Sequence, residues 1–88
     1  MLGFVYILQS VKNNRYYIGS TNNLRRRVKE HKTGQSKYTK NVLPVKLVFV
    51  QRYASLKEAR KIESRLKRLK RKDIIRRIVE NQMISLGP

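Results

Sequence analysis

The sequence lacks cysteine and has few acidic residues: its 88 residues include five Asp and Glu and one His. Without cysteine, neither a disulfide framework nor a zinc site built on cysteine ligands can form. Because carboxylates and imidazoles are this scarce, any metal site must take few protein ligands and complete its shell with water. Mg²⁺ commonly binds in this way.

Long apolar runs and targeting signals are also missing. No stretch approaches the roughly 18 consecutive apolar residues that span a bilayer, and the first four residues lack the basic region and cleavage site of a signal peptide. There is no internal repeat, P-loop, HExxH motif or nucleophile elbow. We therefore expect a cytoplasmic protein without a membrane segment. A chain of this length predicts a single domain over residues 1–88.

Positive charge is abundant. Lys and Arg number 22, which gives a formal net charge of +17 and an isoelectric point near 11.1. Such a field favours a polyanionic partner, and nucleic acid is the commonest one. Many ribosomal proteins are equally basic and catalyse nothing, so charge predicts nucleic-acid binding and leaves catalysis open.

Three segments have the composition of β-strands. Residues 4–8 and 16–19 are rich in β-branched and aromatic side chains, and the polar residues 12–15 between them favour a turn, which predicts a hairpin. Residues 45–53 follow Pro44 and are apolar on both alternating faces in the middle. This pattern is typical of a strand covered on both sides.

Three helices are predicted from their caps and apolar periodicity. The first begins near Leu24 after a polar run of possible N-caps and stops near Gly34. Ser55 and Glu58 form a capping box for the second helix, whose apolar stripe consists of Ala59, Ile62, Leu66 and Leu69.

Asp73 is expected to cap a last helix over residues 74–80, with Ile75, Ile78 and Val79 facing inward. The order β-β-α-β-α-α predicts an α+β fold, a three-stranded antiparallel sheet flanked by helices.

Several side chains that could act in catalysis or bind a metal ion are spaced so that they could lie close together. Tyr6 and Tyr17 lie on the two arms of the hairpin, and a turn near residue 13 would place them side by side. Arg27 and His31 are four residues apart and share one face of a helix. Glu63 lies beside the apolar stripe of its helix, where a carboxylate needs either a salt bridge with a neighbouring cation or a bound metal ion.

These residues carry a family resemblance. Phe4-Val5-Tyr6 stands where the GIY-YIG nuclease superfamily has Gly-Ile-Tyr, and Tyr17-Ile18-Gly19 is an intact YIG, followed by Leu24, Arg27 and His31. The likeness continues through residues 37–39 and 44–48 to Ala59 and Glu63, so it covers most of the chain. The sequence most resembles the small stand-alone members related to the N-terminal nuclease domain of excinuclease C. The departure, Phe4 for Gly, leaves the tyrosine in place.

The resemblance implies a metal-dependent endonuclease that hydrolyses phosphodiester bonds in DNA, of the kind used in repair or recombination. It implies a single Mg²⁺ or Mn²⁺ ion on Glu63, Arg27 on the phosphate oxygens and a motif tyrosine as general base. We prefer Tyr6, with Tyr17 and His31 relaying or orienting, although the sequence does not separate the two tyrosines. A free phenol has a pKa of about 10, so we expect the cations and a metal to lower it. Asn81 is placed in the site in support, with a C-capping role as the alternative.

The remaining basic and aromatic side chains divide between two interpretations. The loop over residues 32–41 is either a phosphate-contacting segment or an ordinary solvated connection, and the run 67–72 is either a stripe along the nucleic-acid backbone or a solvated helix face. The predicted nucleic-acid contacts are Arg25, Arg26, Lys37, Tyr38, Lys40, Lys67 and Lys70. DNA is favoured over RNA. The alternative to an enzyme is a non-catalytic basic binding module on the same fold.

Overall fold

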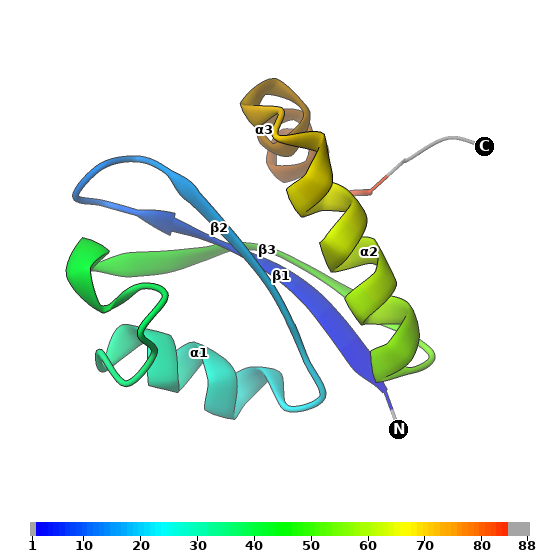
Figure 1. Cartoon of the computed structure of the whole chain (residues 1–88), viewed down its shortest axis with the longest axis horizontal. Coiled ribbons are helices and arrows are strands. Elements are labelled where there is room, and N and C mark those ends of the chain that lie inside the picture. Colours follow the sequence, from blue (N-terminus) through cyan, green and yellow to red (C-terminus); the bar gives the residue numbers. More distant parts are fainter. Residues whose placement is uncertain (1, 85–88) are drawn as a thin grey trace.

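The structure is a computed structural model that describes residues 2–84, and in them a three-stranded antiparallel sheet is flanked by helices (Figure 1). The elements are β1 (Gly3–Ser10), β2 (Tyr16–Thr21), α1 (Leu24–Lys32), a short 3-10 turn η1 (Lys40–Val42), β3 (Val45–Tyr53), α2 (Leu56–Leu69) and α3 (Lys72–Asn81). The strand order is β2-β1-β3. The predicted α+β class and element order are confirmed. No helix among residues 2–84 is long and apolar enough to cross a membrane.

The central strand β1 is apolar on both faces, and this explains why helices cover both sides of the sheet. Val5 and Ile7 point to one face and Tyr6 and Leu8 to the other, and all four are buried. The first face packs against α2 and α3, and the second lies towards α1 (Figure 1). The strand therefore separates two small cores.

The larger core lies between the sheet and the C-terminal helices. Its buried members are Val5, Ile7, Ile18, Phe49, Ala59, Leu66, Ile75 and Ile78. The inward positions predicted for Ile75 and Ile78 are confirmed, and the partly buried Val79 packs against the same cluster. Leu69 differs from the prediction because it is 41% exposed at the end of α2, one turn beyond the sheet-facing part of the stripe.

Local signals explain the turn and two of the helix starts. Asn14 adopts a left-handed conformation with φ of 62° in the hairpin turn, as an asparagine tolerates. Asn23 caps α1 by accepting a hydrogen bond from the Arg26 N–H at 3.1 Å. Ser55 caps α2 in the same way, with the Glu58 N–H as donor at 3.1 Å.

The predicted cap of the last helix is wrong. Arg71 occupies the N-cap position of α3, and Asp73 lies inside the first turn. The Asp73 carboxylate accepts hydrogen bonds from Arg71 Nε at 3.1 Å and Nη2 at 2.7 Å. The carboxylate therefore neutralises the preceding arginine near the positive end of the helix dipole, where an acidic side chain is also favourable.

Candidate active site

The register of the hairpin places Gly19, and not Tyr17, opposite Tyr6. Tyr6 pairs with Gly19 across β1 and β2, and Leu8 pairs with Tyr17. The two tyrosines therefore share a face but stand diagonally, so the prediction that they lie side by side is wrong. The turn is longer than side-by-side pairing of the two tyrosines would require. It shifts the register by two residues, and because this number is even, every side chain stays on its face of the sheet.

Gly19 makes room for the Tyr6 ring. A Cβ atom built on Gly19 would lie 2.3 Å from the Tyr6 hydroxyl oxygen and 2.4 Å from Cζ. The ring thus lies directly against the backbone of β2, and only 2% of Tyr6 is exposed. The absence of a side chain at Gly19 brings the phenol across the strand.

Tyr6, His31 and Thr39 form a buried chain of hydrogen-bonding groups. The Tyr6 hydroxyl lies 2.9 Å from His31 Nε2, and His31 Nδ1 lies 2.7 Å from Thr39 Oγ1. His31 is 1% exposed and Thr39 is fully buried. Burial lowers the pKa of His31, and the nearby Arg27 charge acts in the same direction. The imidazole is therefore held in its neutral form.

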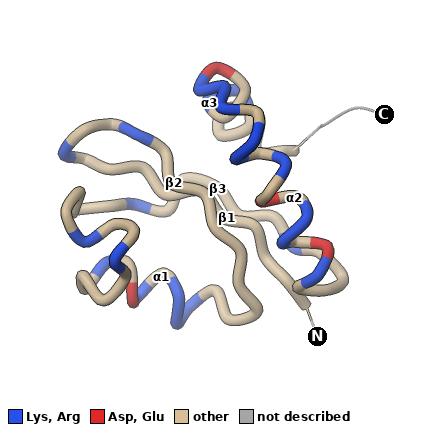
Figure 2. The backbone as a smooth tube through the Cα atoms, in the orientation of Figure 1, with Lys and Arg blue, Asp and Glu red and all other residues tan. Residues whose placement is uncertain are grey.

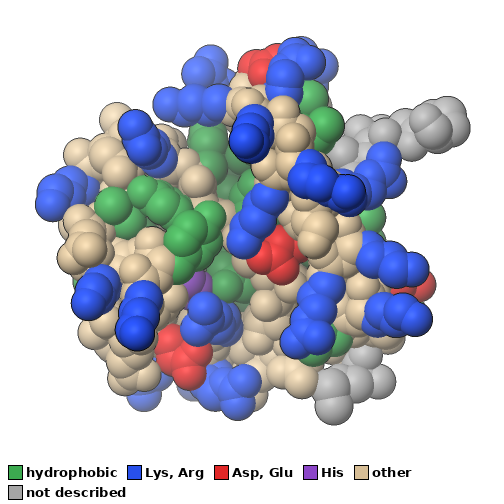
Figure 3. Space-filling view, viewed as in Figure 1, with side chains coloured by type: hydrophobic (Ala, Val, Ile, Leu, Met, Phe, Trp, Pro, Cys, Tyr) green, Lys and Arg blue, Asp and Glu red, His purple; other side chains and the backbone are tan. Residues whose placement is uncertain are grey.

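Arg27 lies on α1 one turn before His31 and is only partly exposed. Its Nη1 atom pairs with Glu30 Oε1 at 3.1 Å, and its guanidinium also acts on the Tyr6 hydroxyl. Figure 3 shows the single histidine at the bottom of a hollow, with hydrophobic and basic side chains next to it. The predicted grouping of the phenol, guanidinium and imidazole is thus present in the structure.

The environment of Tyr6 raises its pKa above the ordinary value. Burial is the largest cause and Glu63 adds to it, while Arg27 and Lys67 act in the opposite direction. We expected cations to lower this pKa, and the protein's own cations do not outweigh the loss of solvent around the ring. The phenol is therefore protonated over the neutral range.

Glu63 reaches this region from α2 and already has two partners. Its Oε1 atom accepts a hydrogen bond from Ser20 Oγ of β2, and its Oε2 atom pairs with Lys67 Nζ at 2.8 Å. A salt bridge, one of the two roles expected for this carboxylate, is therefore present, with a cation one helical turn away. Lys67, expected to contact nucleic acid, is that cation.

The donor set at Glu63 fits one kind of metal ion. The carboxylate is 20% exposed and stands beside the Ser20 hydroxyl. Residues 2–84 contain no group of three or more His, Cys, Asp or Glu side chains that could hold an ion. A zinc site would need more protein ligands than this, whereas Mg²⁺ can bind to few carboxylates and keep most of its water.

Tyr17 belongs to a second group of side chains. Its ring meets the Tyr38 ring edge to face, with centroids 5.2 Å apart, and its hydroxyl accepts a hydrogen bond from Asn13 Nδ2 at 3.1 Å. Lys67 Nζ lies 5.1 Å from the centroid of Tyr38, which is 49% exposed. Tyr17 therefore packs against an exposed aromatic ring that itself contacts a cation.

The other predicted nucleic-acid contacts are exposed. Arg25 and Arg26 lie on α1, Lys37 and Lys40 on the loop that follows it, and Lys70 at the C-cap of α2. Figure 2 shows basic residues on the helices on both sides of the sheet and on the connecting loops. The positive charge is therefore spread over both sides of the sheet.

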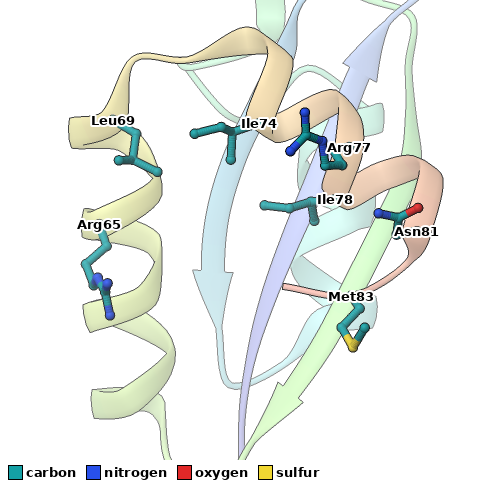
Figure 4. Close-up of a pocket in the computed structure, with 7 residues that line it drawn as sticks. All are labelled: Arg65, Leu69, Ile74, Arg77, Ile78, Asn81 and Met83. Atoms are coloured by element: carbon teal, nitrogen blue, oxygen red, sulfur yellow. The ribbon is translucent and has the colours of Figure 1, made fainter. Parts of the chain in front are cut away.

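Asn81 lies apart from this group. It is exposed at the end of α3 and lines a separate cavity of about 290 Å³ (Figure 4). The other residues that line this cavity are Arg65, Leu69, Ile74, Arg77, Ile78 and Met83. The C-cap of α3 is Gln82, in a left-handed conformation, so the alternative role of Asn81 as the cap is wrong.

Sequence reasoning missed Thr39 and the contact of Ser20 with Glu63. Thr39 stands in a polar loop, and nothing in the local composition indicates that it is buried. Ser20 belongs to the polar run that offers several possible helix caps. Its position next to Gly19 on a strand could have indicated a side chain that points to the opposite face from Tyr6.

Comparisons with known proteins give matches over most of the chain. The family model described as the GIY-YIG catalytic domain matches residues 2–77. A UPF0213 protein of Streptococcus pneumoniae is 42% identical over 80 residues, covering 90% of this chain and 80% of the relative. The UPF0213 protein YazA of Bacillus subtilis is 41% identical over 70 residues, covering 78% of this chain and 70% of the relative. The solution NMR structure of a UPF0213 protein from Bacillus halodurans matches with a TM-score of 0.57 and 34% identity, covering 89% of this chain and 83% of that one.

Proposed function

Because the chain belongs to the GIY-YIG catalytic-domain family, we propose that it is an endonuclease that uses a divalent metal ion to hydrolyse phosphodiester bonds in DNA. The observation that carries the proposal is the buried phenol of Tyr6, bonded at 2.9 Å to His31 with Arg27 beside it. A binding module needs only surface charge, and it has no use for a buried phenol and imidazole pair. The energetic cost of burying these two polar groups is understandable if the pair takes part in proton transfer.

Tyr6 is the general base in this proposal. Hydrolysis requires a water molecule to lose a proton as its oxygen attacks phosphorus, and the Tyr6 oxygen in its ionised form accepts that proton. The raised pKa of Tyr6 means that the ionised form is scarce near neutrality. Tyr17 supports the same assignment, because its position beside Tyr38 suits contact with substrate rather than with His31.

Arg27 stabilises the charge that builds up on the phosphate. Its guanidinium is partly exposed and stands beside the base, so it can reach the non-bridging oxygens of a bound phosphodiester. Charge-assisted hydrogen bonds of this kind are stronger than those between neutral groups. They act most where negative charge increases in the transition state.

Glu63 is the proposed protein ligand of the metal ion. One Mg²⁺ or Mn²⁺ ion at its carboxylate, with water completing the shell, would supply Lewis-acid polarisation of the phosphate and of the leaving oxygen. Lys67 now pairs with the carboxylate, but its side chain is 46% exposed and flexible. The ammonium can therefore turn away towards the substrate backbone when the ion binds.

Glu63→Gln tests the proposal. The ion pair to Lys67 is partly exposed, and pairs four residues apart on a helix contribute about 0.3–0.5 kcal/mol. A glutamine oxygen can still accept the Ser20 hydrogen bond, so the melting temperature should fall only slightly. Cleavage should vanish, and Mg²⁺ or Mn²⁺ should no longer promote it. The assay compares nicked, branched and single-stranded DNA with each metal and with EDTA.

Lys67→Met is the matched control for stability. It breaks the same ion pair and keeps the carboxylate, so its melting temperature should fall equally while the metal still promotes cleavage. If Glu63 serves only as the structural partner of Lys67, the two variants will behave alike in both measurements. A Glu63→Gln protein that nicks at the parent's metal-dependent rate would exclude the ligand assignment.

A non-catalytic nucleic-acid-binding module is the second candidate. The 2.8 Å contact of Lys67 with Glu63 favours it, since a protein that never binds metal there would keep this ion pair. Salt-dependent binding without hydrolysis of any of these substrates, at any metal concentration, would establish this candidate instead.

A further inference from the structure

The buried hydroxyl of Thr39 has one partner. Thr39 is fully buried in the loop between α1 and β3, and His31 Nδ1, 2.7 Å away, is the only hydrogen-bond partner of its Oγ1 atom among residues 2–84. Backbone bonds hold the residue in place: its N–H donates to the Ser36 carbonyl at 3.3 Å, and its own carbonyl accepts from Val42 N–H at 3.0 Å. The hydroxyl is thus aimed at one ring nitrogen.

This arrangement decides where the imidazole carries its proton. A hydroxyl has a single proton to donate, and a buried donor left without an acceptor is costly. Among residues 2–84 the only acceptor within reach of the Thr39 proton is His31 Nδ1, and the only one within reach of the Tyr6 proton is His31 Nε2, but a neutral imidazole can accept only one of the two protons. The Arg27 guanidinium acts on the Tyr6 oxygen as a hydrogen-bond donor and so favours that oxygen as an acceptor, which assigns the unprotonated nitrogen to Nδ1. A neutral imidazole with a bare Nδ1 carries its proton on Nε2, the atom 2.9 Å from the Tyr6 oxygen.

We propose that Thr39 is a positioning residue that holds His31 as the Nε2–H tautomer, so that His31 donates its hydrogen bond to the Tyr6 oxygen. The phenolic proton of Tyr6 then points away from His31. When that proton passes to solvent water, the ionised oxygen keeps the hydrogen bond from Nε2–H, and its remaining lone pairs are free for the attacking water. In the opposite tautomer Nε2 accepts the phenolic proton, and His31 donates no hydrogen bond to the Tyr6 oxygen.

The catalytic consequence rests on the proposed nuclease function, whereas the tautomer itself does not. His31 is the only histidine in the sequence, so ¹⁵N-labelled histidine gives one pair of ring nitrogen signals that need no assignment between residues. The measurement is made on the full chain above pH 7, without metal or DNA. The expected spectrum shows Nε2 protonated and Nδ1 bare.

Two substitutions test the role of the hydroxyl. Thr39→Ser keeps the donor and should keep the Nε2–H tautomer, and Thr39→Val keeps the shape, removes the donor and should add a population with the proton on Nδ1. In cleavage of DNA, kcat of Thr39→Val should fall about 10- to 100-fold, by analogy with the loss of a hydrogen bond that orients a metal-binding histidine. KM should change little, and Thr39→Ser should retain most of the parent rate.

The outcomes separate the two proposals. A parent protein with the proton on Nδ1 would overturn the inference outright, even if Thr39→Val does not fold. A Thr39→Val protein with the parent's tautomer and the parent's kcat would overturn it as well. If no variant or parent cleaves DNA, the nuclease function fails while the nitrogen spectrum still decides the role of Thr39.

Discussion

Gly19→Ala should distort the candidate active site through a single contact. The new Cβ would lie 2.3 Å from the Tyr6 oxygen, 2.4 Å from Cζ and 2.9 Å from Cε2, where ordinary contacts begin near 3.4 Å. The phenol end of the ring must therefore retreat by about 1.1 Å, the difference between 3.4 and 2.3 Å. Its space is limited because Tyr6 packs with Leu8 and Val45 in the smaller core.

The magnitude of the stability loss combines two known effects. Overfilling a packed site costs about 1–3 kcal/mol, and replacing glycine returns about 0.4–1 kcal/mol by restricting the unfolded chain. A net loss of about 1–2 kcal/mol corresponds to a drop in melting temperature of roughly 4–16 °C for a domain of this size. Displacing the phenol by about 1 Å should reduce the cleavage rate about 100-fold.

The assay is a double-mutant cycle with Tyr6→Leu, in which urea unfolding measures the stability of each variant. Leucine lacks the ring end that meets the new Cβ, so Gly19→Ala should be neutral or slightly stabilising in the Y6L background. The backbone of Gly19 is not in the left-handed region, so backbone strain does not contribute. An equal cost of Gly19→Ala in both backgrounds would refute the reasoning, because the loss would then not come from the Tyr6 contact.

Three further predictions concern charge. Arg27→Ala should reduce cleavage about 100- to 1,000-fold and duplex affinity only modestly, since it is one cation among 22; an unchanged rate would show that it does not act on the phosphate. The logarithm of DNA affinity should fall linearly with the logarithm of salt concentration, by about 0.9 for each phosphate contacted, and a flat titration would exclude a polyanionic partner. The lowered pKa of His31 means that its contribution to stability is complete above pH 6.5 and is lost as pH falls towards the folded-state pKa. In that window the free energy of unfolding should fall by up to about 1.4 kcal/mol per pH unit, and His31→Gln should remove this slope in urea titrations at successive pH values.

The elements of the fold could be predicted because their signals are local. The alternation along the strands, the Ser55 cap and the inward Ile75 and Ile78 each depend on neighbours within a few residues. The predicted cap of the last helix was wrong because a second local interaction competed with it. A nearby cation, Arg71, took the Asp73 carboxylate, and sequence alone did not rank that ion pair above the cap.

The site could be predicted only as a set of residues. Tyr6, Arg27 and His31 do come together, since one strand and one helix face bring them there. What remained hidden was the pairing between elements, because the register of the hairpin and the burial of Thr39 depend on how the turn and the loop close. Such closures are set by tertiary packing rather than by composition.

The three residues of the YIG motif have three separate roles. These roles follow from the alternation of side chains between the two faces of a strand. Ile18 points into the larger core and holds β2 against the C-terminal helices. Tyr17 and Gly19 both belong to the opposite face, where the glycine leaves the space that the Tyr6 ring fills and the tyrosine contacts the exposed ring of Tyr38. The two tyrosines of the motif are therefore not interchangeable. Tyr6, opposite the glycine, meets the buried histidine, whereas Tyr17 meets the exposed ring of Tyr38, over which Lys67 lies.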